Sequence, residues 1–161
     1  MTTKEYNQCV DEYADGVYRF ILKNLRDEDT AKDVVQDAFA KMWEKRENVD
    51  GKKAKSYLFT AAYHTMIDYI RKDRKRDVDD GFLERHCTES NSYSDLKEIL
   101  DEAIETLPEI QKSVILLRDY EGYSYKEIGD IVELTESQVK VYIFRGRLAL
   151  KKYIGSMEMV L

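Results

Sequence analysis

The chain has 161 residues, and its 26 lysines and arginines against 32 aspartates and glutamates give a formal net charge of −6. This length allows one domain or two small ones, because domains usually contain about 100–150 residues and rarely fewer than about 50. Hydrophobic residues account for 43% and charged residues for 36%, which argues against a disordered or membrane-embedded protein. One proline and seven glycines leave few helix breakers, so the composition favours an all-α fold over a β-sandwich or barrel.

Membrane and secretory signals are missing from the sequence. The longest aliphatic run is residues 114–117, far below the roughly 20 apolar residues of a membrane-spanning helix. The first residues lack the apolar core of a signal peptide, so we expect a cytoplasmic protein without membrane insertion. Cys9 and Cys87 are too few for a disulfide framework and are expected to be free thiols.

Motifs that carry catalytic chemistry are also missing. The chain contains no nucleophile elbow, no P-loop and no glycine-rich dinucleotide motif. Cys9, Cys87, His64 and His86 are four possible zinc ligands, but they lack the C-x-x-C or H-x-x-x-H spacing of zinc sites. We therefore predict no enzyme activity, no catalytic or metal-binding residues, no cofactor and no small-molecule substrate.

The charges are distributed unevenly along the chain. Residues 1–76 carry 16 bases and 14 acids, residues 77–95 carry six acids and one base, and residues 96–161 carry nine bases and twelve acids. The middle segment lacks helical periodicity and is rich in Ser and Asp, which predicts a flexible acidic linker. The sequence thus predicts two small helical domains, 1–76 and 96–161, joined by the linker 77–95.

Two amphipathic helices are predicted before residue 47. In the first, apolar residues recur at three- and four-residue steps: Tyr13, Val17, Phe20, Ile21 and Leu25. The second covers residues 30–46, where Thr30 followed by Asp33 resembles a capping box. Its apolar stripe contains Ala31, Val34, Val35, Ala38, Phe39, Met42 and Trp43, and its opposite face contains Asp33, Gln36, Asp37 and Lys41.

A third helix is expected from Ser56 to about Lys75, after a polar loop at residues 47–55. Its inward face holds Leu58, Phe59, Ala62, Met66, Tyr69 and Ile70, and its other face holds Thr60, His64, Asp68, Arg71 and Lys75. Residues 71–76 contain five bases and one acid, next to an aromatic-rich stretch. Basic and aromatic side chains together suit unstacked bases, which stack on aromatic rings. Most of these aromatics belong to the core, but Tyr57, Tyr63 and His64 are expected nearer the rim.

The second half has sharper helix boundaries. Apolar spacing from Leu96 to Leu107 predicts a helix that stops near Pro108, and Pro108 suits the first turn of the next helix, which ends at Gly122. Two capping boxes follow, Ser124-x-x-Glu127 and Thr135-x-x-Gln138. They predict a short helix at 125–132, a tight turn at 133–134 and a longer helix from Glu136 to about Tyr153. This is a helix-turn-helix arrangement.

The last helix has two different faces. Val139, Ile143, Gly146 and Leu150 share one side and are expected in the core. The opposite side carries Ser137, Val141, Phe144, Arg145 and Leu148, with Lys140 at its margin. Exposed apolar groups beside bases suit the DNA major groove, where Arg bonds guanine edges and apolar groups touch thymine methyls. Residues 140–153 contain five bases and no acid, which suits phosphate contacts.

Several segments together resemble the extracytoplasmic-function (ECF) sigma factors of bacterial RNA polymerase. The matching segments are DVVQDAFAKMW at 33–43, SYLFTAAYHTMIDYIRK at 56–72, LP at 107–108, EGYSYKEI at 121–128, and VK and FRGR within 139–147. They occur in the family's order over nearly the whole chain. His64 stands where the family commonly has Asn, and Gly129 and Gly146 stand where it commonly has Ala.

The resemblance implies an alternative sigma factor that binds core RNA polymerase and directs initiation at promoters. Residues 1–76 would be sigma region two and residues 96–161 sigma region four. The residues implied in polymerase binding are Asp33, Gln36, Asp37 and Lys41. Those implied at the minus-ten element are Asn48, Val49, Tyr57, Thr60, Tyr63, His64, Arg71 and Lys75, and those at the minus-thirty-five element are Lys126, Ser137, Gln138, Lys140, Val141, Phe144 and Arg145. The resemblance also implies an anti-sigma factor as a partner.

Two alternatives remain open on the sequence alone. A stand-alone helix-turn-helix regulator would dimerise on operator DNA, and it would leave the helix at 30–46 with no role beyond packing. A helical adaptor without DNA contact is favoured only by the net acidity. Because affinity for DNA rests heavily on phosphate neutralisation, the charge of −6 argues against a protein that acts on DNA alone.

Overall fold

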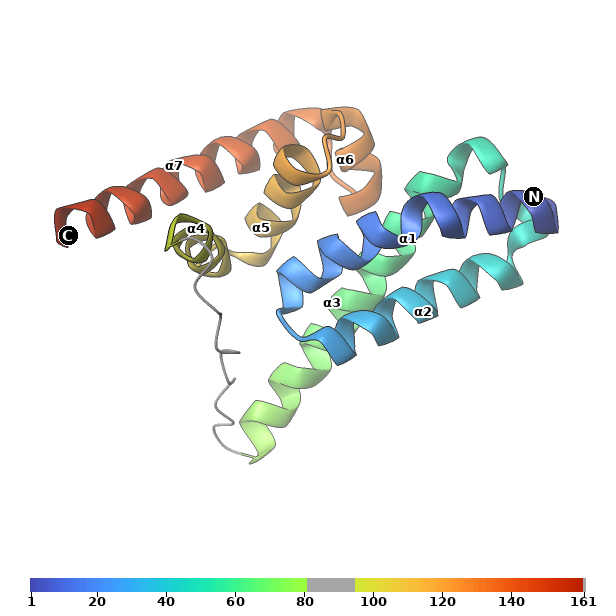
Figure 1. The fold of residues 1–161 in the computed structure, drawn as a ribbon, viewed down its shortest axis with the longest axis horizontal. Coiled ribbons are helices and arrows are strands. Elements are labelled where there is room, and N and C mark those ends of the chain that lie inside the picture. Colours follow the sequence, from blue (N-terminus) through green and yellow to red (C-terminus); the bar gives the residue numbers. More distant parts are fainter. Residues whose placement is uncertain (81–94, 161) are drawn as a thin grey trace.

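The structure, a computed structural model, describes the backbone of residues 1–80 and 95–160 and the side chains of residues 1–75 and 96–156. Its described part is helical throughout (Figure 1), which confirms the all-α prediction. The elements are α1 (Thr3–Leu25), α2 (Glu28–Glu44), η1 (Arg46–Asn48), η2 (Gly51–Lys53), α3 (Ala54–Asp80), α4 (Asp95–Glu105), α5 (Glu109–Ile115), η3 (Leu116–Tyr120), α6 (Tyr125–Val132) and α7 (Glu136–Val160). We call α1–α3 the first helical unit and α4–α7 the second helical unit.

The structure defines the start of the first helix, which the sequence analysis left open, and moves the start of the second. Helix α1 begins at Thr3, because Thr2 and Glu5 form a capping box in which each side chain accepts from the other's backbone N–H, at 3.1 and 3.2 Å. The predicted cap at Thr30 was wrong. Asp27 caps α2 by accepting from the Asp29 N–H at 3.1 Å and from the Thr30 hydroxyl at 2.8 Å.

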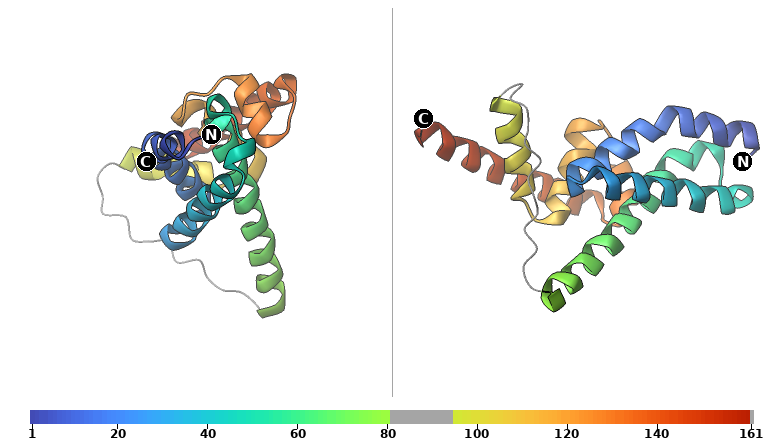
Figure 2. Two further views of the ribbon diagram at one scale, coloured as in Figure 1. Left: turned by 90° about the vertical axis from the view of Figure 1, so that its right-hand side faces the viewer. Right: turned by 60° about the horizontal axis from the view of Figure 1, so that its bottom comes forward.

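Helix α3 is longer than predicted. It begins at Ala54 and continues to Asp80, so residues 77–80 of the expected linker are helical. Asp95, the last residue of that segment, begins α4. Residues 81–94 lie outside the described residues, and with them the prediction of a flexible joint. The C-terminal part of α3 projects from the body of the protein, as does that of α7 (Figures 1 and 2).

The first helical unit packs its three helices around a core that the apolar spacing predicted. Phe20, Met42, Leu58 and Met66 are fully buried. Polar contacts also hold the helices together: the Lys41 ammonium donates to the Thr65 hydroxyl at 2.8 Å, between α2 and α3. The N-terminal ammonium of Met1 donates to the backbone carbonyls of Arg46 and Val49, which ties the start of α1 to the η1 loop.

The second helical unit contains the predicted helix-turn-helix, formed by α6 and α7. Ser124 accepts from the Glu127 N–H at 3.1 Å to cap α6. Thr135 and Gln138 form the second capping box reciprocally, at 3.2 and 3.0 Å. The turn between them places Glu133 in the left-handed region, with φ of 60°.

Gly129 and Gly146 of this unit lie close to neighbouring atoms. A Cβ on Gly129 would lie 2.5 Å from the Leu134 carbonyl oxygen in the turn, and a Cβ on Gly146 would clash with the buried Ile115 Cδ1. Close approach of the backbone therefore requires glycine at position 129 in this turn, whereas at position 146 the tip of the Ile115 side chain would have to shift. No such requirement was visible in the sequence, where a helical glycine only lowers helix propensity.

The two helical units pack against each other, and one apolar cluster runs through both. Helix α3 packs on α6, and α1 packs on α5, which the two views of Figure 2 also show. The Phe59 ring joins the two cores, because its centroid lies 5.9 Å from that of Phe20 and 5.0 Å from that of Tyr123. Within the described ranges, none of the helices has the length and apolarity that a membrane crossing requires.

Candidate nucleic-acid interface

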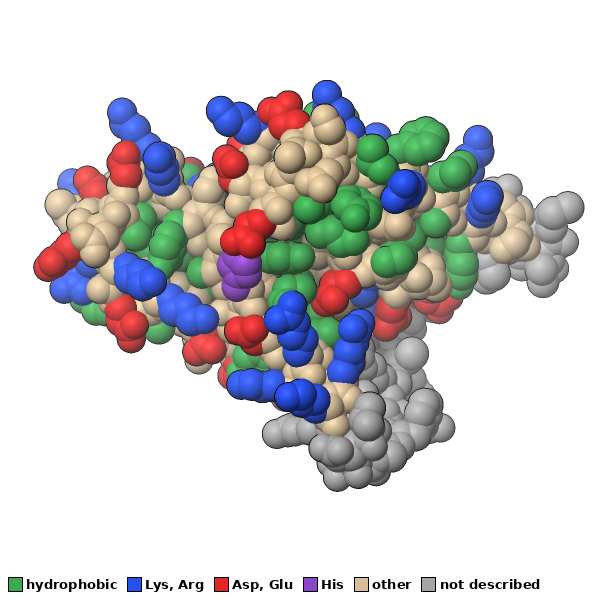
Figure 3. All heavy atoms as spheres, turned by 180° about the vertical axis from the view of Figure 1, so that it is seen from behind, with side chains coloured by type: hydrophobic (Ala, Val, Ile, Leu, Met, Phe, Trp, Pro, Cys, Tyr) green, Lys and Arg blue, Asp and Glu red, His purple; other side chains and the backbone are tan. Residues whose placement is uncertain are grey.

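Helix α7 has the two faces that its sequence predicted. Val139, Ile143 and Gly146 are buried, whereas Val141, Phe144 and Leu148 are 44%, 68% and 45% exposed. Ser137, Gln138, Lys140 and Arg145 are exposed as well. On the surface, hydrophobic and basic side chains lie side by side along α7 (Figure 3).

Several polar side chains of α7 have partners on neighbouring residues. The Gln138 carbonyl oxygen accepts from the backbone of Thr135, which leaves the amide nitrogen of Gln138 as its donor. The Lys140 ammonium lies 5.4 Å from the centre of the Tyr125 ring. Arg147 forms an ion pair with Asp119, and its pKa is raised by that hydrogen bond. The positive charge of the segment is therefore partly neutralised at Arg147, a pairing that the charge count missed. Lys126 is exposed on α6.

The residues predicted for the minus-ten element lie along α3 and the preceding loop. His64, Arg71 and Lys75 are exposed, and basic side chains gather on the projecting part of α3 (Figure 3). Tyr57 and Thr60 are half-buried, and Asn48 is exposed.

Two of the predicted residues are buried instead. Tyr63 is only 9% exposed and Val49 only 8%, so the expectation that Tyr63 lies near the rim was wrong. Burial, followed by the nearby carboxylates of Glu109 and Glu133, raises the pKa of Tyr63. Both carboxylates belong to the second helical unit, which packs on α3 through α6.

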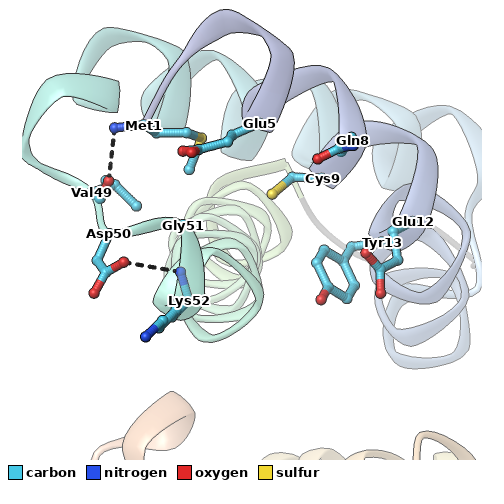
Figure 4. Close-up of a pocket in the computed structure, with 10 residues that line it drawn as sticks. All are labelled: Met1, Glu5, Gln8, Cys9, Glu12, Tyr13, Val49, Asp50, Gly51 and Lys52. Carbon is cyan, nitrogen blue, oxygen red and sulfur yellow. Dashed lines mark hydrogen bonds between the residues drawn. The ribbon is translucent and has the colours of Figure 1, made fainter.

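A cavity of about 490 Å³ lies beside the η2 loop, between that loop and the start of α1 (Figure 4). Glu5, Glu12 and Asp50 line it together with Cys9. Burial and the two α1 carboxylates raise the pKa of the Cys9 thiol, which makes it a poor nucleophile. The carboxylates also repel phosphate, so the cavity does not suit nucleic acid. No group of three or more metal-ligating side chains occurs among the described residues.

The predicted polymerase-binding face lies on α2. Asp33, Gln36 and Asp37 are exposed there. Lys41 is exposed too, but its ammonium is bonded to Thr65. Trp43, expected in the apolar stripe, is 37% exposed and packs between the Tyr6 ring and the Arg46 guanidinium, at 4.8 and 4.0 Å.

Comparisons with known proteins agree with this geometry. Residues 9–76 match the family description "Sigma-70 region 2" and residues 97–150 match "Sigma-70, region 4". The class defined by the fold and these matches is therefore the sigma factors, the non-enzymatic subunits that direct RNA polymerase to promoters.

Comparison with individual proteins identifies the group of sigma factors to which the chain belongs. The ECF RNA polymerase sigma factor SigM of Bacillus subtilis is 31% identical over 156 residues, which span 94% of each chain. The ECF RNA polymerase sigma-E factor of Escherichia coli is 29% identical over 91% of this chain and 85% of its own. The sigma factor RpoE of Bartonella quintana, solved in complex with the anti-sigma factor NepR, is 26% identical, with a TM-score of 0.81 over 95% of this chain and 98% of its own. The chain belongs to the ECF sigma factors, which direct promoter recognition and transcription initiation by RNA polymerase.

Proposed function

We propose that the two helical units divide promoter recognition between them. The second unit reads the minus-thirty-five element with α7, the first unit reads and melts the minus-ten element with α3 and its preceding loop, and the exposed face of α2 binds core polymerase. The observation that carries the proposal is the outer face of α7, where Phe144 is 68% exposed beside the exposed Arg145. Val141 and Leu148 are exposed on the same face of α7, and a contiguous exposed apolar strip bordered by polar side chains marks an interaction site.

The α7 face fits duplex DNA. The second helix of a helix-turn-helix enters the major groove with its N-terminal part, where Ser137, Gln138 and Lys140 lie. Arg145 can bond a guanine edge, while Val141 and Phe144 contact thymine methyl groups. Lys126, exposed at the start of α6, would contact a phosphate.

The α3 face fits an unstacked strand. His64, Arg71 and Lys75 are exposed on one helix, and aromatic and basic groups together hold bases and phosphates of single-stranded DNA. Extruding a base costs a few kcal/mol. Tyr57, Thr60 and Tyr63 are the side chains that would offset this cost, together with Asn48 and Val49 in the loop.

The exposed face of α2 fits a basic protein surface. Asp33, Gln36 and Asp37 offer acceptors to it, and Lys41 keeps the helix in place through Thr65. Because the polymerase is a DNA-binding enzyme of the cytoplasm, we also propose that this chain acts there. The likeness to a sigma factor solved with the anti-sigma factor NepR supports an anti-sigma factor as a further partner.

Transcription in vitro tests the proposal. Purified chain, core polymerase and a library of genomic promoter fragments are expected to give initiation at discrete sites, with none from either protein alone. A stand-alone regulator would instead footprint palindromic DNA without polymerase. Absence of specific initiation on every template would overturn the proposal.

A further inference from the structure

One hydrogen bond between α2 and α3 lies beside the proposed polymerase-binding face. The Lys41 ammonium donates to the Thr65 hydroxyl oxygen at 2.8 Å, and that hydroxyl donates to the Ala61 carbonyl oxygen, also at 2.8 Å. Because an ammonium group cannot accept a hydrogen bond, the order of donors is fixed, from lysine to threonine and from threonine to the backbone. Thr65 is only 4% exposed, so its hydroxyl is a well-defined acceptor within the contact of the two helices.

Helix geometry offers Lys41 a second partner on its own helix. Side chains on an α-helix lean toward its N-terminus, so a lysine at position 41 leans toward the turn that carries Asp37. An acid four residues before a lysine is the favourable order for an ion pair on a helix surface. Asp37 and Lys41 have this spacing, yet the ammonium is bonded to Thr65 instead.

The carboxylates of α2 therefore keep their charge uncompensated within the chain. Among the side chains that the structure describes, none forms an ion pair with Asp33 or Asp37. Both residues are exposed, and like charges at a four-residue spacing destabilise a helix. This arrangement suits a basic partner that neutralises both carboxylates when it binds.

We propose that Thr65 is a positioning residue for polymerase binding, because it draws the Lys41 ammonium away from Asp37. The carboxylates of α2 then meet a basic surface of core polymerase without an intramolecular competitor, and without a cation that this surface would repel. Lys41 acts through its bond to α3 and not as a polymerase contact, which differs from the role that the family resemblance implies. The proposal rests on the proposed function of α2, whereas the bond between Lys41 and Thr65 does not.

The effect on affinity is expected to be modest, because the two interactions open to Lys41 are both weak. A hydrogen bond from an ammonium group is stronger than one between neutral groups, which favours the buried Thr65 hydroxyl. An exposed lysine–aspartate pair contributes little, since water screens the charges and both side chains must be ordered. Loss of the hydroxyl is therefore expected to weaken core binding by roughly two- to fivefold. Most of the change should appear in the association rate, which charges at the rim of an interface affect directly.

Nitrogen NMR of the lysine ammonium groups in the free chain tests the bond itself. An ammonium held by a buried hydroxyl exchanges its protons with water more slowly than a solvated one, so the Lys41 signal is expected to be protected. Thr65→Val should remove this protection, whereas Thr65→Ser, which keeps the hydroxyl, should retain it. Rapid exchange at Lys41 in the native chain would overturn the proposal without any measurement on polymerase.

Titration and stopped-flow association with core polymerase test the consequence. Thr65→Val is expected to bind core more weakly, and Thr65→Ser to restore binding. The double variant Lys41→Met/Thr65→Val is expected to bind core more tightly than Thr65→Val, because it has no ammonium to pair with Asp37. Thr106→Val is the matched control: this hydroxyl also donates to a backbone carbonyl, that of Ala103, but it lies in the second helical unit, and its loss should not change core binding.

Three results with polymerase would overturn the proposal. Native affinity of Thr65→Val would mean that Lys41 does not compete for Asp37. A double variant as weak as Thr65→Val would assign the loss to packing of α3, because removal of Lys41 cannot repair a packing defect. If Lys41→Met bound core as weakly as Thr65→Val, Lys41 would be a polymerase contact. Failure of the proposed function is distinguishable, since Asp37→Arg would then bind core like the native chain while the Lys41 ammonium stayed protected.

Discussion

The Arg19 guanidinium donates to both carboxylate oxygens of Glu121, each at 2.8 Å, across 102 residues of sequence. Arg19 lies on α1 and Glu121 just after η3, so this contact joins the two halves of a two-region sigma factor. Hydrogen bonding to Glu121 raises the pKa of Arg19, which keeps the guanidinium charged.

Arg145→Ala tests base recognition by α7. Arg145 is exposed, so its loss is expected to leave folding unchanged and to weaken binding of the minus-thirty-five duplex by about 1–3 kcal/mol, with relaxed sequence preference. Fluorescence anisotropy with promoter and scrambled duplexes measures both effects. Lys152→Ala is the control, because it removes one charge further along α7 and should reduce affinity evenly for both duplexes. If Arg145→Ala and Lys152→Ala lost the preference for promoter over scrambled duplex equally, the role of Arg145 would be contradicted.

Asp37→Arg tests the polymerase-binding face of α2. Reversing an exposed carboxylate that faces a basic partner is expected to weaken core binding by about 2 kcal/mol or more. Titration of core polymerase with labelled protein measures the affinity. Asp11→Arg makes the same change on exposed α1 and should bind core like the native chain. Unchanged affinity of Asp37→Arg would assign that carboxylate to the solvated surface.

Gly146→Ala tests close packing in the second helical unit. The added methyl group would clash with Ile115 Cδ1, and overpacking of this kind costs roughly 1–3 kcal/mol of unfolding free energy. Ile115→Val deletes that atom, so the double variant should be less destabilised than the sum of the single ones. Gly155→Ala is the control: nothing lies within 4 Å of its added Cβ, and helix propensity should stabilise it by roughly 0.5–1 kcal/mol. Denaturant unfolding measures the four variants against the native chain, and additive single effects would contradict the clash.

Acid is expected to loosen the contact between the units through Glu127. The Lys55 ammonium, more than the Ser124 hydroxyl, lowers the pKa of Glu127 in the folded chain, although partial burial opposes it. A lowered pKa means that the separated state binds the proton more readily, so the Lys55–Glu127 pair stabilises the contact above the ordinary pKa of 4.5 and loses this effect as pH falls through the lower, folded value. Scattering between pH 7 and 3 should show expansion in acid. Glu127→Gln should be less sensitive to pH in this range; an identical pH profile would contradict the assignment.

The sequence predicted the elements of each unit better than their ends. Helical spacing identified the buried faces of α3 and α7 because both follow from a local period of 3.6 residues. The first helix was missed at its start, although Thr2 and Glu5 have the spacing of a capping box. The cap of α2 was misplaced because Asp27 and Thr30 both offer oxygens, and only the backbone conformation at Asp27 distinguishes them.

The sequence also predicted the exposure of some candidate site residues correctly and that of others wrongly. All the α7 residues predicted to face outward do so, because an isolated helix face is a property of local sequence. Tyr63 was misjudged, because burial depends on tertiary packing; carboxylates of the other unit, Glu109 and Glu133, lie near enough to raise its pKa. The pairing of Arg147 with Asp119 was also missed, since nothing in the local charge pattern indicates a partner 28 residues earlier.

The sequence by itself determined the all-α class, the helix-turn-helix, the family and the two faces of α7, because each depends on residues close together in the chain or on motifs in a fixed order. Only the tertiary structure showed that basic side chains of the first unit form ion pairs with acidic side chains of the second. The net charge of −6 therefore gives no sign that surfaces of opposite charge on the two units contact each other. Such a pairing depends on which surfaces meet across some hundred residues, and local periodicity does not contain that information.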